Sequence, residues 1–128
     1  IFTEVRLKKY LEVRSIDECE WDCHCAGPAF YTGLIYGNLD ESLDVIKKWD
    51  QSEVLNAYYD SPKRGLNTII NNKTILEWGK IFLDISKDGL KKRKYINSNN
   101  QDETVFLKNV ENILNEKKTR AEKVLEKL

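Results

Sequence analysis

The sequence predicts an α+β fold that is mostly helical, with N-terminal β-structure followed by about six helices. Polar and apolar residues alternate between Glu4 and Arg14, as in a β-strand whose two faces meet different surroundings. Further along, apolar residues recur roughly every three or four positions, as in helices that bury one side. No repeat or low-complexity tract divides the chain. We therefore expect residues 1–128 to form one unit, with a strand region at 1–17 and a helical region at 28–128.

The composition is that of a globular domain without net charge. Hydrophobic residues make up 41% of the chain, and Lys+Arg and Asp+Glu both number 21. This balance lacks the basic excess that attracts nucleic acid or an anionic membrane surface, so neither is expected as a partner. No apolar run approaches the roughly 20 residues of a membrane-spanning helix. The sequence has no Met and opens directly into strand-like residues, so we expect a piece of a larger protein. With no spanning run and no signal peptide in the sequence, a reducing, cytoplasmic setting is the default expectation.

The N-terminal alternation carries the candidate functional residues. Its polar positions are Glu4, Arg6, Lys8, Tyr10, Glu12 and Arg14. Between them lie Val5, Leu7, Lys9, Leu11 and Val13, and we expect the valines and leucines among these to be buried. A solvated outer sheet face is the usual explanation for such a pattern. A mixture of carboxylates and guanidiniums is also what a site for a metal ion and phosphate requires, so this strand is where we look for function.

Three helices are predicted in the first part of the helical region. Residues 28–36 are nearly all apolar and begin with Pro, which suits the first turn of a buried helix. Asn38 and Glu41 have the spacing of a capping box at the start of a second helix. A third helix is expected to begin at a cap formed by Ser52 and to end before Pro62, because proline disfavours helical backbone at the preceding residue.

The remaining helices follow a polar connector at residues 63–73, in which residues 69–70 favour a short extended segment. Thr74 and Glu77 form the best capping box in the chain. The helix that they start has a continuous apolar stripe that fades at Gly89. Its stripe consists of Ile75, Trp78, Ile81, Phe82 and Ile85.

After a hydrophilic turn at residues 97–101, a helix is expected over about 102–116. Thr119 and Glu122 again have capping-box spacing and predict a last helix. The basic run at residues 91–94 falls at the end of the long helix, where cations complement the helix dipole.

A short cluster of potential metal ligands comprises Cys19, Cys23, His24 and Cys25. Structural zinc usually takes two pairs of ligands that are separated along the chain. Because three of these four residues are consecutive, closing a tetrahedron around one ion would require severe backbone folding. We therefore expect free thiols, a loop position for the histidine, and no structural zinc.

The sequence also resembles a known family. Residues 10–17, Tyr-Leu-Glu-Val-Arg-Ser-Ile-Asp, are similar to a strand of the glutamate–cysteine ligases, and a looser Ile-Glu-x-Arg pattern occurs across the glutamine-synthetase-like superfamily. The likeness continues along the chain in family order, through Trp21, Cys25-Ala-x-Pro-Ala-Phe30, Gly33-Leu-Ile-Tyr36, Gly89-Leu, Asp102-Glu-Thr and Thr119-x-Ala-Glu122. It spans essentially the whole chain as the C-terminal portion of a plant or α-proteobacterial type of the ligase. One departure is the family turn Gly-Gly-Pro-Trp, which is Glu18-Cys-Glu-Trp21 here.

The resemblance implies an ATP-dependent ligase that joins the γ-carboxylate of glutamate to the amine of cysteine through an acyl phosphate. The N-terminal strand would belong to an antiparallel, glutamine-synthetase-like sheet. Glu12 resembles a Mg²⁺ ligand. Arg14, on the same face and about 6–7 Å away, would be the catalytic cation that binds the transferred phosphoryl group or a substrate carboxylate. Arg6 is a further candidate for substrate or nucleotide binding and Glu4 a weaker one, although cross-strand ion pairs explain both equally well.

An alternative from another class is a helical interaction or regulatory module without chemistry of its own. Such a module has no need for a strand that presents carboxylates and guanidiniums on one face. In either case we expect the chain alone to be inactive, because one strand cannot supply the other metal ligands and the adenine site. The unpaired edge of the N-terminal strand should also favour self-association of the chain through residues 3–14.

Overall fold

A computed structural model describes residues 4–16 and 19–128 of the chain. The ends of the predicted strand region, residues 1–3 and 17, lie outside the described residues, as does residue 18. Two antiparallel pairs of strands are present, β1 (Val5–Leu7) with β2 (Leu11–Val13) and β3 (Ile69–Ile70) with β4 (Lys73–Thr74). The α-helices are α1 (Ala26–Thr32), α2 (Leu39–Ile46), α3 (Gln51–Arg64), α4 (Ile75–Arg93), α5 (Lys108–Glu116) and α6 (Arg120–Leu125). The predicted α+β class, mostly helical and with strands first, is confirmed.

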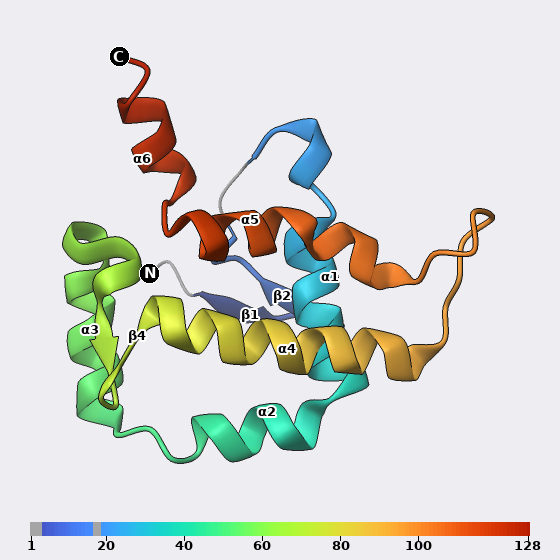
Figure 1. Cartoon of the computed structure of the whole chain (residues 1–128). Helices are drawn as coiled ribbons and strands as arrows, with labels where there is room; N and C mark the ends of the chain where they lie inside the picture. Colours follow the sequence, from blue (N-terminus) through green and yellow to red (C-terminus); the bar gives the residue numbers. More distant parts are fainter. Residues whose placement is uncertain (1–3, 17–18) are drawn as a thin grey trace.

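The long helix α4 forms the centre of the molecule. Figure 1 shows α5 running along one side of α4 and α2 along the other, while α3 and the β3–β4 hairpin close one end. A small core lies where α1, α4, the 3₁₀ turn at Glu103–Leu107 and α5 meet. Its buried members are Ala29, Leu83, Leu90, Leu107 and Leu114. No helix in the described part of the chain is long and apolar enough to span a bilayer.

Glycines allow a close approach between α4 and the segment that follows α1. The first predicted helix is α1 followed by a π-helical turn at Gly33–Gly37, and this turn packs directly on α4 at Gly89. A Cβ on Gly89 would overlap the carbonyl oxygen of Gly33 and lie 2.9 Å from its carbonyl carbon. The hydroxyl of Ser86 donates a hydrogen bond to the carbonyl of Phe30 at 2.9 Å in the same interface. The apolar stripe of α4 therefore fades at Gly89 because small residues admit a neighbouring backbone, and the helix itself continues to Arg93.

The two capping boxes predicted for later helices are confirmed. The backbone N–H of Glu77 donates to the Thr74 hydroxyl at 3.2 Å, and the Glu77 carboxylate accepts from the Thr74 N–H at 2.7 Å. Thr119 and Glu122 make the same reciprocal pair at the start of α6. The capping box expected at Asn38 is not formed. The Asn38 amide nitrogen donates to the Glu41 carboxylate at 2.7 Å, but its amide oxygen accepts from Lys92 on α4 at 2.9 Å and not from the backbone of α2.

The third helix begins earlier and ends later than its pattern suggested. Asp50, rather than Ser52, is the N-cap of α3, and its carboxylate accepts from the backbone N–H groups of Ser52 and Glu53. Pro62 does not stop the helix, which continues to Arg64. Pro62 cannot donate to the carbonyl of Tyr58, but the hydroxyl of Ser61 donates to that oxygen at 3.1 Å. The carbonyl is thus satisfied, and the helix tolerates the proline.

Candidate functional site

The N-terminal segment is a hairpin, so the prediction of one continuous strand over residues 4–14 is wrong. The chain reverses at residues 8–10, and β1 pairs antiparallel with β2. Arg6 lies directly opposite Glu12, and the backbone N–H of Arg14 donates to the carbonyl of Glu4 at 2.8 Å. The reversal lacks the Gly, Asn or Asp residues that usually mark a hairpin turn, so the alternation alone predicts a single strand.

The reversal nevertheless keeps the polar residues on one face. Residues that lie opposite one another in an antiparallel pair project to the same side, so the polar positions of both strands share a face. The opposite face is exposed, with 53% of Val5, 80% of Leu7 and 67% of Leu11 accessible to solvent. The expectation that these residues are buried is therefore wrong for this chain, because no other described element covers the hairpin's apolar face.

The polar face is organised around the carboxylate of Glu12. Arg6 Nε and Nη2 both lie 2.6 Å from Glu12 Oε2, and Lys8 Nζ is 3.6 Å from Oε1. The hydrogen bond from Arg6 lowers the pKa of Glu12 below its ordinary value, and the positive charges of Arg6, Lys8 and Arg14 lower it further. Glu12 is therefore ionised at neutral pH.

The structure brings the other predicted residues to the same hairpin. Arg14 directly follows β2 and is close enough for its charge to act on Glu12. Arg6, the candidate for substrate or nucleotide binding, is held in a cross-strand ion pair. Glu4 accepts a long hydrogen bond, 3.4 Å, from the hydroxyl of Tyr58, which connects the hairpin to α3. Sequence reasoning did not foresee this contact, because Tyr58 lies far along the chain.

Glu12 fits a metal site as a single ligand. An ionised carboxylate on a paired strand is the hard oxygen donor that Mg²⁺ prefers. Within residues 4–16 and 19–128, however, no three His, Cys, Asp or Glu side chains gather around a common point. Any metal held by Glu12 would therefore need further ligands from elsewhere in the protein.

The cysteine cluster differs from its prediction. Cys19 and Cys23 form a disulfide, so the expectation of free thiols at these two positions is wrong. The turn at Trp21–Cys23 brings the two cysteines together, with 6.1 Å between their Cα atoms. Cys25 is a free, exposed thiol, and His24 lies in the turn before α1. The disulfide leaves two fewer thiolates for a metal.

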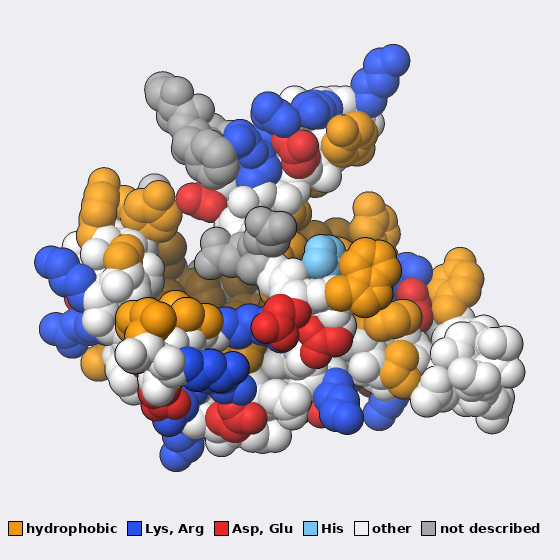
Figure 2. All heavy atoms as spheres, turned by 90° about the horizontal axis from the view of Figure 1, so that it is seen from above, with side chains coloured by type: hydrophobic (Ala, Val, Ile, Leu, Met, Phe, Trp, Pro, Cys, Tyr) orange, Lys and Arg blue, Asp and Glu red, His pale blue; other side chains and the backbone are white. Residues whose placement is uncertain are grey.

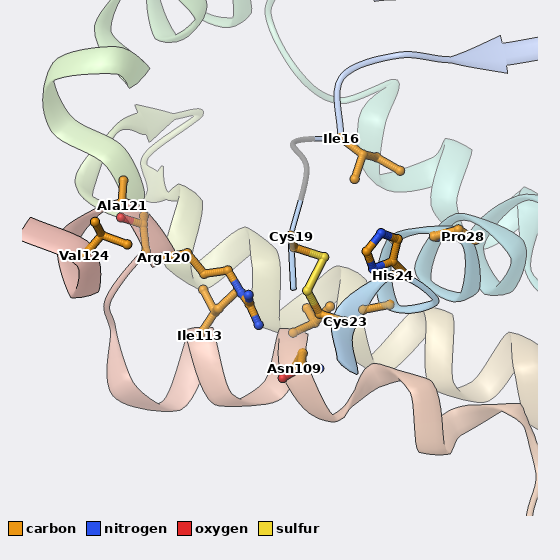
Figure 3. A pocket seen from close by; sticks show the side chains of 14 residues that line it. Ile16, Cys19, Cys23, His24, Pro28, Asn109, Ile113, Arg120, Ala121 and Val124 are labelled. Carbon is orange, nitrogen blue, oxygen red and sulfur yellow. A yellow bond between two sulfur atoms is a disulfide. The ribbon is translucent and has the colours of Figure 1, made fainter. Parts of the chain in front are cut away.

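An open groove that the sequence did not reveal lies beside this disulfide. It has a volume of about 910 Å³ and runs between the cysteine loop and helices α5 and α6. Figure 3 shows its apolar walls, to which Ile16, Ile113 and Val124 contribute, and the disulfide at its edge. Asn109, which also lines the groove, donates to the carbonyl of Asp22 at 2.9 Å.

On the face seen in Figure 2, acidic and basic side chains intermingle with hydrophobic ones, and the chain carries no net charge.

Comparison with known proteins places the chain in a family. The model of glutamate-cysteine ligase family 2 (GCS2) matches residues 1–127. The chain belongs to this family. The resemblance found in the motifs along the sequence is thereby confirmed, including its extent over essentially the whole chain.

Individual ligases of this family are also similar to the chain over nearly its whole length. The chloroplastic glutamate–cysteine ligase of Solanum lycopersicum is 36% identical over 128 residues, which are 98% of this chain and 23% of that protein. The chloroplastic enzyme of Arabidopsis thaliana is 37% identical with the same coverage. Glutamate–cysteine ligase A of Oryza sativa subsp. indica is 35% identical over 127 residues, 98% of this chain and 25% of that enzyme. The chain thus spans about a quarter of the length of these ligases.

The expected cytoplasmic location is corrected by the same comparison. The relatives named above are all chloroplastic proteins, and this finding contradicts the cytoplasmic expectation. Location is set by targeting segments that the pattern of strands and helices does not encode, so the default drawn from composition had no physical basis in these residues.

Proposed function

We propose that the chain is part of an ATP-dependent ligase that joins the γ-carboxylate of glutamate to the amine of cysteine. In this reaction the γ-carboxylate attacks the γ-phosphorus of ATP, ADP leaves, and an acyl phosphate forms. The amine of cysteine then attacks the acyl carbon, phosphate leaves, and the amide bond is made. The family match over residues 1–127 and the names of the relatives support this reaction.

The polar face of the hairpin is the part of the chain that we assign to the chemistry. Glu12 would be one ligand of Mg²⁺, which when bound neutralises charge on phosphate oxygens. Arg14 would bind the transferred phosphoryl group or a substrate carboxylate through its planar, multiply donating guanidinium. The observation that carries this assignment is the hairpin register, which sets Arg6 opposite Glu12 and leaves Arg14 on the same face two residues along.

The hairpin is also suited to a larger antiparallel sheet. Within the described residues, β1 and β2 pair only with each other, so their outer backbone edges remain available to further strands. Its apolar face is exposed, as expected of a sheet face that another layer covers. Because the relatives are about four times longer, we infer that the rest of the ligase supplies those strands, the remaining metal ligands and the adenine site.

A comparison of the chain with the full-length ligase that contains it tests this proposal. We expect phosphate release from ATP by the full-length protein to require both glutamate and cysteine, and to yield the dipeptide in equal amount. The chain alone should release none. Release by the chain alone would contradict its incompleteness, and turnover without cysteine would contradict the assigned reaction.

The helical-module alternative makes a different prediction for the same protein. A non-catalytic module would leave turnover intact when the polar groups of the hairpin are replaced. The ion-paired cluster around Glu12 favours the catalytic role, because a regulatory helical unit has no use for it.

A further inference from the structure

Arg6 holds one of the two oxygens of the Glu12 carboxylate and leaves the other open. Its Nε and Nη2 atoms both lie 2.6 Å from Oε2, so two donors converge on one acceptor. The second oxygen, Oε1, has Lys8 Nζ at 3.6 Å, which is beyond hydrogen-bond distance. Oε2 is therefore fixed by the Arg6 guanidinium, while Oε1 can accept a further partner.

The hairpin register determines this arrangement. Arg6 and Glu12 are directly opposed across β1 and β2, so both side chains leave the backbone at the same level and on the same face. The pair does not depend on a long reach by either side chain. Its side chains are 46% and 29% exposed, and an ion pair so open to solvent contributes little to stability. We therefore look for its role in the orientation of Glu12 rather than in holding the fold.

We infer that Arg6 is a positioning residue that orients Glu12 so that Oε1 faces the metal, and that it does not itself bind the substrate or nucleotide. This inference rests on the proposed function of Glu12 as a Mg²⁺ ligand. Ligating carboxylates are commonly fixed by a hydrogen bond to their second oxygen, and loss of that partner weakens metal binding. Two N–H donors of Arg6 converge on Oε2 and its charge is already balanced by Glu12, so a substrate anion would have to compete with that carboxylate.

Binding of Mn²⁺ to the full-length ligase, followed by electron paramagnetic resonance of the free ion, tests the inference without any turnover. Arg6→Gln should raise the Kd for Mn²⁺ on the order of tenfold, because the carboxylate is no longer held. Arg6→Lys should restore part of the loss, since an ammonium can donate to Oε2 without the fixed fork. The control is Lys9→Gln, which removes one positive charge from an exposed position in the turn and should leave the Kd unchanged.

Each other outcome has a distinct meaning. A tighter Kd in Arg6→Gln would show that the guanidinium competes with the metal, and would overturn the inference. An unchanged Kd accompanied by a raised KM for ATP or glutamate would place Arg6 on a substrate and would also overturn it. A lower unfolding temperature with an unchanged Kd would reduce the ion pair to a structural contact, again against the inference.

A second variant separates this inference from the function on which it rests. Glu12→Gln should weaken Mn²⁺ binding at least as much as Arg6→Gln, and the double variant should bind no worse than Glu12→Gln alone. If Glu12→Gln binds Mn²⁺ normally, the proposed metal ligand is wrong. If Glu12→Gln weakens binding but Arg6→Gln does not, only the positioning role of Arg6 fails.

Discussion

Replacement of Gly89 by alanine tests the packing that organises the fold. Gly89 lies inside α4, where alanine would ordinarily stabilise the helix by about 1 kcal/mol. In this structure the new Cβ would overlap the carbonyl oxygen of Gly33 and lie 2.9 Å from its carbonyl carbon and 3.2 Å from the backbone nitrogen of Asn38. All of these neighbours are backbone atoms, so no side chain can rotate away, and the π-helical turn must move off α4.

The expected cost follows from these opposing effects. Overpacking of a well-packed interior costs typically about 1–3 kcal/mol, and a contact with backbone belongs at the upper end of that range. After the gain in helix propensity, we expect Gly89→Ala to lower the free energy of unfolding by about 2 kcal/mol. For a domain of this size this corresponds to a fall in Tm of roughly 6–10 °C.

Gly79→Ala is the matched control, because it changes the same residue type in the same helix. There the nearest atom to the new Cβ is Leu114 Cδ2 at 2.7 Å, the end of a side chain that can adjust, and the next atom is 3.7 Å away. The gain in propensity should offset that adjustment, so its stability should stay within about 1 kcal/mol of the wild type. Thermal and urea unfolding, followed by circular dichroism, measure both variants. If Gly89→Ala were as stable as Gly79→Ala, the close contact between the π-helical turn and α4 would be refuted.

Other predictions concern caps, covalent links and the exposed hairpin. Thr74→Ala should lower the free energy of unfolding by about 1 kcal/mol through loss of the capping box, and an unchanged Tm would contradict that role. The backbone N–H and hydroxyl of Thr74 hold the pKa of Glu77 below its ordinary value. Because the pKa of Glu77 is lower in the folded than in the unfolded state, the ionised carboxylate stabilises the fold above the unfolded pKa, and this stabilisation is lost as the pH falls through the folded pKa. The difference in Tm between the wild type and Glu77→Gln should therefore shrink to zero on acidification. Cys19→Ser should cost about 2 kcal/mol under oxidising conditions and nothing in excess reductant, as unfolding in the two buffers would show. The isolated chain should self-associate with rising concentration in sedimentation experiments and Leu7→Lys should suppress this, whereas a strictly monomeric wild-type chain would contradict the hairpin's tendency to pair.

The features that the sequence predicted correctly are those that neighbouring residues determine. The capping boxes of Thr74 and Thr119 each need only a glutamate three residues on, so a short window contains all the information. Asn38 has the same spacing to Glu41 and does donate to its carboxylate, but it forms no capping box, because its amide oxygen accepts from Lys92 on α4, about fifty residues away. Pro62 likewise stays within its helix, because the Ser61 hydroxyl donates to the carbonyl that the proline leaves without a partner. The general tendency of proline to end helices does not take such a contact into account.

The candidate site could be predicted in composition but not in shape. The alternation from Glu4 to Arg14 identified which residues share a polar face, and this holds in the hairpin because opposed residues project to the same side. It did not reveal the reversal, since residues 8–10 carry no turn signal, and so it could not show that Arg6 lies opposite Glu12. The disulfide between Cys19 and Cys23 was also missed, because it depends on a turn that the family pattern does not contain.

The turnover of Glu12→Gln in the full-length ligase tests the central claim most directly. The amide keeps the shape of the side chain and an oxygen, but loses the charge that would hold a divalent cation against water. We predict that the variant folds with a Tm close to that of the wild type and loses most of its kcat for γ-glutamylcysteine formation. Arg14→Lys should be similarly impaired and Lys9→Ala unaffected. Near-normal kcat in Glu12→Gln at saturating Mg²⁺ would contradict the assignment of the hairpin's polar face to catalysis.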